Sequence, residues 1–297
     1  MPMNTPILLV DSYAQIYRGF HAVRYLSTPD GVPTNAVFAM TKFLLKLHKE
    51  HPSQNGAFVF DKGKPAFRME LAPDYKANRP PMPDELKVQI PVIRDLVQAF
   101  GWSLIEHEGY EADDILGTLS AACAARSDDC FLATGDRDSL QLVDDATTVL
   151  LATNKETIPM DPAAIREKYG IEPPQLIDVK SLMGDSSDNI PGVPGIGEKT
   201  ALALISKFGS LQGVYDNIED KAVKPGQRAK LTANRDKADL SYMLGTIRRD
   251  APIETDPSAY IRRPGDPAAA AQLLAALEMH KLVDRWGLES GAAPAAA

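Results

Sequence analysis

The apolar and polar positions along the chain predict short strands in its first half and helices in its second half. Five apolar runs predict buried strands, the fifth near a sheet edge: 7–10, 57–60, 102–105, 130–133 and 147–152. Apolar residues at helical spacing predict an amphipathic helix over 34–50, between the first two strands. Because strand, helix and strand in succession form a right-handed crossover, we expect a parallel sheet.

Most of the remaining chain has a helical pattern. A helix is predicted over 84–100, with a kink or a restart at Pro91 because proline breaks helical hydrogen bonding. Further helices are predicted in the second half: 161–169, 173–183, a hairpin pair over 188–208, 210–218, 227–247 and 267–285. The expected fold class is α/β, with three parts: a parallel-sheet core over 1–175, a helical subdomain over 176–290 and a disordered, low-complexity tail over 291–297.

Composition excludes a membrane-spanning protein and leaves most other classes open. The chain has 297 residues, of which 44% are hydrophobic and 24% charged, as in ordinary globular proteins. No apolar run approaches the ~20 residues that span a bilayer, and the first residues lack the pattern of a signal peptide. Cys123 and Cys130, the only cysteines, are expected to be reduced core residues. We therefore expect a cytoplasmic protein that does not contact membranes.

Acidic residues recur where predicted strands end. Asp11 and Asp61 each follow an apolar run, and in open α/β sheets the ligand site lies beyond the carboxyl ends of the strands. Asp136 and Asp138 follow the run 130–133. Either of the first two alone could be an ordinary helix cap, and the second pair could be a turn. Their common position at one sheet edge favours a functional site.

Two further groups of acids complete the set. Glu111, Asp113 and Asp114 begin a predicted helix, where the helix dipole favours negative charge and where capping is the simpler explanation. Asp185 and Asp188 lie three apart in the stretch 181–201. Nine carboxylates that converge would repel one another unless cations bound between them. Two divalent ions, Mg²⁺ or Mn²⁺, would suit in-line displacement at phosphorus.

The same stretch contains a glycine-rich turn directly after its acids. Gly192, Gly195 and Gly197 precede Lys199 and Thr200 at the start of an apolar helix. Glycine allows backbone N–H groups to approach a phosphate closely, and a helix N-terminus favours an anion. A metal ligand pair beside a phosphate cradle suggests chemistry on a nucleic-acid backbone.

The net charge of −8 argues against a nucleic-acid partner only if the charges are evenly spread. Nine of the 40 carboxylates belong to the expected metal cluster. Basic residues form two groups: Lys62, Lys64, Arg68, Lys76 and Arg79, then Lys221, Lys224, Arg228, Lys230, Arg235 and Lys237. An acidic pocket between basic surfaces fits a metal-dependent nuclease, although a solvated acidic protein can look similar.

A basic, proline-rich segment over 62–83 is too long for an ordinary connection between a strand and a helix. It could be a flexible surface loop. Its position directly after Asp61 favours a mobile arch over the site, in which Lys76 and Arg79 bind phosphates and Tyr75 stacks on a base.

The chain resembles the 5′-nuclease family, which comprises the N-terminal 5′–3′ exonuclease domain of bacterial DNA polymerase I and its flap-endonuclease relatives. The matching strings lie within residues 7–201: LLVDSYAQIYRGFHA, FVFD, YKANR, GYEADD, TGDRDSLQL and GDSSDNIPGVPGIGEKTA. The resemblance implies a PIN-like core with a helical arch over about 62–100. It also implies a helix-three-turn-helix over about 185–210.

The resemblance also implies roles for the acids and bases. Asp11, Asp61, Glu111 and Asp113 would hold one divalent ion, and Asp136, Asp138 and Asp188 the other, with Asp114 and Asp185 farther from the ions, behind their direct ligands. Lys76 and Arg79 would engage the phosphate that is cut, and the turn from Gly192 to Thr200 would grip duplex phosphates, with K⁺ beside it. Arg18, in the first matching string, is a further expected DNA contact.

The implied activity is hydrolysis of DNA at a 5′ end or flap junction, in replication and repair. The expected partners are DNA with 5′ ends, flaps or nicks, with a DNA polymerase and a ligase as candidates, and the chain is expected to act as a monomer. Ser12 stands where relatives usually have glycine. The short alanine-rich end favours a free-standing nuclease over the excised domain of a polymerase. Alternatives are a DNA-binding module without activity, a phosphatase, and a nuclease that prefers RNA in RNA·DNA hybrids.

Overall fold

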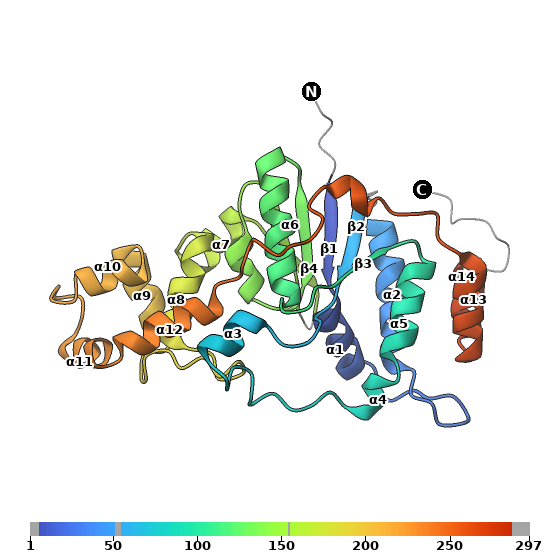
Figure 1. Ribbon diagram of the computed structural model, residues 1–297, viewed down its shortest axis with the longest axis horizontal. Coiled ribbons are helices and arrows are strands. Elements are labelled where there is room, and N and C mark those ends of the chain that lie inside the picture. Colours follow the sequence, from blue (N-terminus) through green and yellow to red (C-terminus); the bar gives the residue numbers. More distant parts are fainter. Residues whose placement is uncertain (1–5, 51–54, 154, 287–297) are drawn as a thin grey trace.

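A six-stranded sheet forms the centre of the larger part of the molecule (Figure 1). The computed structural model describes residues 6–50, 55–153 and 155–286. The strand order is β3-β2-β1-β4-β5-β6, and only β6 is antiparallel to its neighbour. The strands are β1 (Ile7–Asp11), β2 (Asn55–Val59), β3 (Ser103–Ile105), β4 (Cys130–Thr134), β5 (Thr147–Ala152) and β6 (Thr157–Met160). The five predicted strands and the parallel sheet are confirmed, whereas β6 was not predicted because its sequence, TIPM, is short and contains proline.

The sheet is covered on both faces, which explains the continuous apolar runs of its central strands. Leu8 and Val10 of β1 pack on one side with the helices α1 (Ser12–Ala22), α2 (Asn35–Glu50) and α5 (Ile90–Ala99). Ile7 and Leu9 pack on the other side with α6 (Ala112–Arg126) and α7 (Pro162–Tyr169). Cys123 and Cys130 are buried in this second layer as free thiols, as predicted.

Several predicted helices have different bounds or are divided. The helix over 84–100 restarts as expected: α4 (Asp84–Lys87) ends before α5, which carries Pro91 in its first turn. The single helix predicted over 267–285 is two helices in the structure, α13 (Pro267–Ala276) and α14 (His280–Trp286). The helix α13 packs beside α5 and α14 (Figure 1). The helix α1 was missed, because it begins directly after β1 without an intervening turn. The predicted tail over 291–297 lies outside the described residues.

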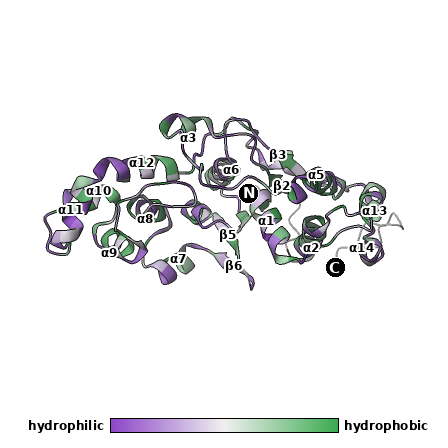
Figure 2. Ribbon diagram, turned by 90° about the horizontal axis from the view of Figure 1, so that it is seen from below, coloured by the Kyte–Doolittle hydropathy of each residue, from purple (hydrophilic) through white to green (hydrophobic). Residues whose placement is uncertain are grey.

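Five helices after the sheet enclose a third apolar core, at the left of Figure 1. They are α8 (Leu176–Met183), α9 (Glu198–Phe208), α10 (Leu211–Asp216), α11 (Pro225–Ala233) and α12 (Arg235–Gly245). The hairpin pair expected over 188–208 is only partly helical, since α9 begins at Glu198 after a loop rich in proline and glycine. The helix predicted over 227–247 is divided into α11 and α12 at Asn234. Figure 2 shows hydrophilic positions along α11 and α12.

The segment 62–83, called the arch segment below, runs from β2 to α4 and packs against these helices. It contains α3 (Ala66–Leu71) followed by turns, and Tyr75 packs in a small apolar cluster with Ile190 and Leu244. The segment therefore packs against the helical part in this structure, and its predicted mobility stays a prediction. Among the described residues, no helix is long and apolar enough to cross a membrane.

Arg68 of α3 joins three parts of the fold through one buried guanidinium group. It is 2% exposed and binds both carboxylate oxygens of Asp114 in α6, at 2.7 and 2.8 Å. It also donates to the carbonyl oxygens of Leu244 (2.9 Å) and Thr246 (3.0 Å), at the end of α12. Because a bidentate pair of this kind fixes geometry, Arg68 sets how the arch segment, α6 and α12 meet.

Removing Arg68 is therefore expected to destabilise the protein strongly. Arg68→Ala leaves the buried Asp114 carboxylate without its partner, a change that costs about 3–5 kcal/mol in comparable sites. Arg166→Ala is the matched control, because Arg166 pairs with Glu172 on the surface and such pairs contribute about 1 kcal/mol or less. Urea unfolding of both variants measures the difference. Equal loss of stability in the two would contradict the role given to Arg68.

Candidate active site

Asp11 and Asp61 lie at the carboxyl ends of adjacent strands, as the sequence predicts. Asp11 ends β1 and caps α1, since its side chain accepts a hydrogen bond from the Ala14 N–H at 3.1 Å. The Thr134 hydroxyl, at the end of β4, donates to its other oxygen at 2.8 Å. Asp61 follows β2 and accepts from the Ala112 N–H at 2.7 Å. Asp11 is therefore both a helix cap and a candidate site residue, so these two interpretations do not exclude each other.

These two acids line a cavity of about 330 Å³ together with other predicted site residues. Glu111 and Asp113 reach it from the start of α6, and Asp136 from the turn after β4. The cations Lys76 and Arg79 line it from the arch segment. Tyr13, Tyr17 and Met82 also line it, although the sequence analysis did not select them.

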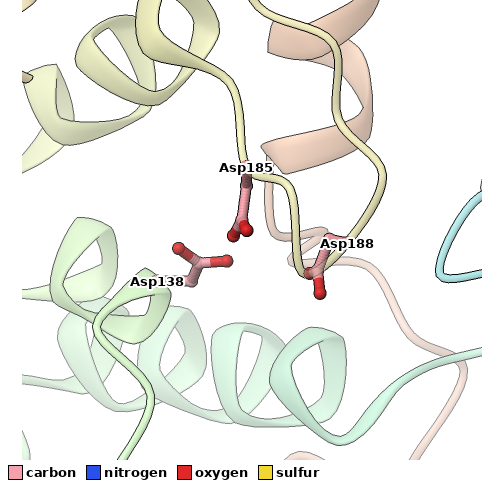
Figure 3. A group of neighbouring side chains, drawn as sticks. All are labelled: Asp138, Asp185 and Asp188. Atoms are coloured by element: carbon pink, nitrogen blue, oxygen red, sulfur yellow. The ribbon is translucent and has the colours of Figure 1, made fainter. Parts of the chain in front are cut away.

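A second acidic group lies beside the first, between the start of the 3₁₀ helix η1 (Asp138–Leu142) and the loop after α8. Asp138, Asp185 and Asp188 each offer one carboxylate oxygen, and these oxygens lie within 4.8 Å of one another (Figure 3). The structure thus places Asp185 with Asp138 and Asp188, whereas the resemblance implied a more distant position for it.

Asp136 connects the two groups electrostatically. Burial, followed by the charge of Asp61, raises the pKa of Asp11 to about 7, and Asp136 adds to that effect. Burial and then the charge of Asp136 raise the pKa of Asp138 to about 6. The same two causes raise the pKa of Asp113 well above its ordinary value. The acids are therefore close enough to oppose one another's ionisation.

Lys180 is a site residue that the sequence analysis missed. Its ammonium group forms a short ion pair with Asp138 and lies 2.9 Å from the Asp185 carboxylate. Although burial opposes its charge, Asp138 and Asp185 raise its pKa above the ordinary value. Hydrogen bonds from Ser187 and the charge of Lys180 outweigh burial at Asp185 and lower its pKa to about 2. A lone lysine among apolar residues of α8 was the available sequence signal.

Two basic residues of the arch segment also pair with predicted metal ligands. Lys76 forms a short ion pair with Glu111, and Arg79 lies 2.5 Å from Asp188. The backbone N–H of Lys76 donates to the Asp188 carbonyl at 2.9 Å, and Lys76 has a left-handed φ of 57°. Asn189, also left-handed, donates to Asp74 at 2.9 Å. The arch segment is thus fastened to the loop that carries Asp185 and Asp188.

Tyr75 does not fit the predicted role of stacking on a base in this conformation. Its side chain is buried at 7% exposure, and its hydroxyl donates to Glu111 at 3.1 Å. Burial, followed by the charge of Glu111, raises its pKa, so the hydroxyl keeps its proton and remains a donor. In this structure the Tyr75 hydroxyl therefore orients the Glu111 carboxylate.

Asp114, for which the resemblance implies a position farther from the ions, makes four hydrogen bonds within the protein. One oxygen accepts from Arg68 and from the Arg248 N–H (2.9 Å), and the other accepts from Arg68 and from the Glu111 N–H (3.1 Å). Since a carboxylate has about four lone-pair positions, none is left for an ion. The sequence alone counts Asp114 among the converging acids, because it does not reveal the buried Arg68 that satisfies this carboxylate.

Gly192 also differs from its predicted role as a phosphate contact. Its N–H donates to the Ser241 hydroxyl at 2.9 Å. Gly184 and Gly192 have φ values of 73° and 57° and pack back to back, so that a Cβ on either would meet the other's backbone at less than 3 Å. These two glycines close the loop, and Gly192 has no N–H left for a phosphate.

The rest of the glycine turn is accessible. Gly195 has a φ of 82° and accepts a hydrogen bond from Lys230 of α11 at 3.2 Å. Gly197 is the N-cap of α9 and has open space where a side chain would be. Lys199 is exposed and Thr200 half-buried in the first turn of α9. Arg18, the other predicted contact, donates to the Thr153 carbonyl at 2.6 Å.

The donor set fits hard divalent cations. The cavity acids offer only oxygen ligands, and their repulsion favours a positive charge between them. Asp11 and Asp138, with raised pKa values, would ionise fully once a cation bound. Oxygen-only sites of this kind suit Mg²⁺ or Mn²⁺ better than soft metals.

Two family models match consecutive parts of the chain. Residues 6–170 match the 5'-3' exonuclease N-terminal resolvase-like domain, and residues 171–268 match the 5'-3' exonuclease C-terminal SAM fold. The chain belongs to the 5′-3′ exonuclease family. The predicted resemblance and the α/β fold with a helical second part are therefore confirmed.

Curated relatives of this exonuclease chain include longer proteins. The DNA polymerase I of Pseudomonas aeruginosa is 42% identical over 274 residues, which are 90% of this chain and 30% of the relative. The DNA polymerase I of Bacillus subtilis is 39% identical over 296 residues, which are 99% of this chain and 33% of the relative. The chain thus spans about a third of the length of these relatives.

Solved structures share the exonuclease fold at low sequence identity. A zinc-bound T5 5'-exonuclease matches with a TM-score of 0.68 and 21% identity, covering 96% of this chain and 97% of its own. The catalytic core of Rad2 in complex with DNA substrate matches with a TM-score of 0.63 and 18% identity, covering 95% and 90%. Both likenesses concern the fold.

The raised pKa values predict that the metal-free exonuclease loses stability as the pH rises through neutrality. A carboxyl group whose pKa rises from 3.8 to about 7 on folding holds its proton more tightly when folded. The contribution of this group to the free energy of unfolding is complete at pH values below its pKa in the unfolded state. It is lost as the pH rises through its pKa in the folded state, by about 1.4 kcal/mol per pH unit. Thermal unfolding in EDTA should therefore give a higher midpoint at pH 5.5 than at pH 8.5.

Divalent ions should remove much of this pH dependence, because they compensate the ionised acids in the folded state only. Asp11→Asn should weaken the dependence in EDTA, whereas Asp30→Asn, at an exposed position, should leave it unchanged. Identical midpoints at both pH values, with and without Mg²⁺, would show that the acids do not form a repulsive site.

Proposed function

We propose that this chain is a metal-dependent 5′-3′ exodeoxyribonuclease and 5′-flap endonuclease that acts in DNA replication and repair. The observation that carries the proposal is the cavity in which Asp11, Asp61, Glu111, Asp113 and Asp136 meet the cations of the arch segment. Acids alone would suit metal binding, and cations alone would suit phosphate binding. Their presence in one cavity supports cleavage of a phosphodiester bond.

We assign two divalent ions, Mg²⁺ or Mn²⁺, to the two acidic groups. Asp11, Asp61, Glu111 and Asp113 would hold the first, and Asp138, Asp185 and Asp188 the second, with Asp136 between them. Such ions supply an activated water and stabilise the leaving oxygen in an in-line displacement. Thr134 and Ala112 keep Asp11 and Asp61 oriented by the hydrogen bonds that they donate.

Lys76 and Arg79 are proposed to bind the phosphate that is cut. Both are held by acids in the absence of an ion: Lys76 by Glu111 and Arg79 by Asp188. Ion binding would draw these carboxylates away from the two cations and leave their N–H groups for phosphate oxygens. Arginine in particular presents a planar fork that fits two oxygens at once.

The loop before α9 is proposed to grip the phosphate backbone of the duplex. Gly195, Gly197, Lys199 and Thr200 surround the start of the helix, where unpaired N–H groups favour an anion. A K⁺ ion near this turn is part of the proposal. Basic residues of α11 and α12, including Lys230 beside Gly195, would extend the same surface.

The proposed biological setting follows from the proposed chemistry. DNA with 5′ ends, flaps or nicks is the substrate, and a DNA polymerase and a ligase act before and after the cut. The chain is proposed to act in the cytoplasm as a monomer. Because phosphate contacts carry little sequence information, recognition would depend on the shape of the DNA and not on its sequence.

Replacing one cavity acid should abolish cleavage while leaving the DNA grip. Asp11→Asn and Asp61→Asn are expected to lower single-turnover cleavage of a 5′-labelled flap by orders of magnitude in Mg²⁺, because each removes a charged ligand. Their affinity for flap DNA should stay within a few-fold, since the proposed grip lies at α9. Asp30→Asn, at an exposed acid that lines neither the catalytic cavity nor the start of α9, serves as the control. Near-normal cleavage by either aspartate variant would contradict the assignment.

Gly197→Val tests the loop before α9 without straining the backbone. Gly197 has an extended φ of −98° and nothing within 4 Å of the position where a Cβ would lie, so valine fits. A branched side chain over the first N–H groups of α9 should nevertheless obstruct a phosphate. We expect weaker binding to every DNA sequence alike, with cleavage retained at saturating DNA. A folded Gly197→Val protein with wild-type affinity and salt dependence would place the grip elsewhere, as in the basic surface of α11 and α12.

A further inference from the structure

Aromatic rings and cations alternate along a line of contacts that ends at the catalytic cavity. In each contact, the end of an arginine or lysine side chain lies 4.5–5.9 Å from the centre of a ring. At such distances the negative face of the ring attracts the cation. Six residues form this line, called the stacked row below: Tyr110, Arg248, Phe67, Arg68, Tyr75 and Lys76.

Arg248 is the cation at the outer end of the stacked row. It follows α12, and its guanidinium carbon lies 5.0 Å from the centre of the Phe67 ring and 5.5 Å from that of the Tyr110 ring. The side chain also donates two hydrogen bonds to Asp250, at 2.8 and 2.5 Å, and the backbone N–H donates one to Asp114 at 2.9 Å. Arg248 is not among the described residues that line the catalytic cavity. Its side chain therefore joins the end of the helical part to α3 and to the start of α6.

Phe67 carries this contact into the arch segment. It belongs to α3, which lies beside α12 (Figure 1), and its ring contacts the guanidinium groups of both Arg248 and Arg68. The backbone then links α3 to the turn that follows it, because the Ala72 N–H donates to the Arg68 carbonyl and the Tyr75 N–H to the Ala72 carbonyl, each at 2.9 Å. A contact that fixes Phe67 thereby restrains this turn as well.

Lys76, at the end of that turn, reaches the catalytic cavity. Its φ of 57° is left-handed, a conformation that a residue with a side chain keeps only where its surroundings impose it. Its ammonium group pairs with Glu111 and lies 5.1 Å from the centre of the Tyr75 ring. Once an ion takes the Glu111 carboxylate, the contact with the ring remains and keeps the ammonium group in place.

We propose that Arg248 is a positioning residue for cleavage, because it fixes α3 through Phe67 and so sets where Lys76 stands in the catalytic cavity. The inference rests on the proposed function, in which Lys76 binds the phosphate that is cut. It gives a task in the reaction to a side chain that lies outside the cavity. Rigid support matters here, because a shift of about 1 Å at a catalytic group can lower a rate about a hundredfold.

Two simpler roles have to be separated from positioning: support of the fold alone, and attraction of DNA by a positive charge. Arg248→Met keeps the stem of the side chain and removes its charge and its plane. Arg249→Met is the matched control, because Arg249 is the next residue, is exposed, and contacts neither the Phe67 ring nor the Tyr110 ring. Phe67→Leu removes the ring and leaves both arginines. Urea unfolding of each variant establishes the conditions in which it is folded.

Cleavage is measured in single turnovers on a 5′-labelled flap at saturating DNA in Mg²⁺, and affinity is measured in Ca²⁺. Arg248→Met should lower the cleavage rate about two- to fivefold for each ring contact that it removes, and Phe67→Leu should act in the same direction. Affinity and its salt dependence should match those of Arg249→Met, since both variants lose one charge. Arg248→Lys should recover part of the rate, because an ammonium group also attracts a ring.

The comparison is then repeated in Lys76→Ala. Because Arg248 is proposed to act through Lys76, Arg248→Met should slow Lys76→Ala no further, while its effect on stability should be the same in both backgrounds. The Asp250 side chain is 62% exposed, so Arg248→Met leaves no buried charge without its partner and should fold. If it does not fold, Phe67→Leu serves for the same comparison.

Three results would overturn the proposal. Arg248→Met could cleave as fast as Arg249→Met. It could weaken binding with no loss of rate at saturating DNA, which would make Arg248 a DNA contact. It could slow the wild type and Lys76→Ala by the same factor, which would make its role purely structural. In each of these cases only this inference fails, whereas wild-type cleavage by Lys76→Ala itself would contradict the proposed role of Lys76 and this inference with it.

Discussion

Repulsion between carboxylates is the constraint on which the rest of this structure depends. Parallel strands bring their carboxyl ends to one edge, and this chain puts acids there from β1, β2 and β4 and adds others from α6 and from the loop after α8. Burial makes the repulsion stronger, as the pKa values of Asp11 and Asp138 indicate. A fold with this arrangement must supply positive charge at the same place.

The chain supplies part of that charge itself. Lys76 and Arg79 arrive from the arch segment, and Lys180 from α8, and each pairs with an acid of the site. These pairs also connect elements, because the arch segment reaches the loop after α8 mainly through contacts around Asp188 and Asn189. The charges that line the site therefore also help to assemble it.

The sequence predicted the sheet and the convergence of most of the selected acids, because both depend on short-range patterns. An apolar run that ends in aspartate indicates a strand and a candidate site acid together, which is why Asp11 and Asp61 were selected, and both line one cavity. Residues whose role depends on a distant partner were not predictable. Arg68 binds the Asp114 carboxylate from 46 positions away in the sequence, and the Ser241 hydroxyl accepts the Gly192 N–H from 49 positions away. Without these distant partners in view, the sequence analysis counted Asp114 among the acids around a metal and Gly192 among the phosphate contacts. Lys180 was missed for the same reason, since only the folded chain brings its ammonium group beside the Asp138 carboxylate.

The central proposal is that this acidic edge holds two divalent ions, one of them in competition with the Lys180 ammonium group. Calorimetric titration of the DNA-free protein with Mn²⁺ at pH 8 tests it most directly, with the wild type beside Lys180→Met. Methionine keeps the apolar stem of the side chain and removes its charge. The account predicts two ions per chain, with one ion bound more tightly by Lys180→Met and the other unchanged. Fewer than two ions in the wild type, or the same two affinities in both proteins, would contradict it.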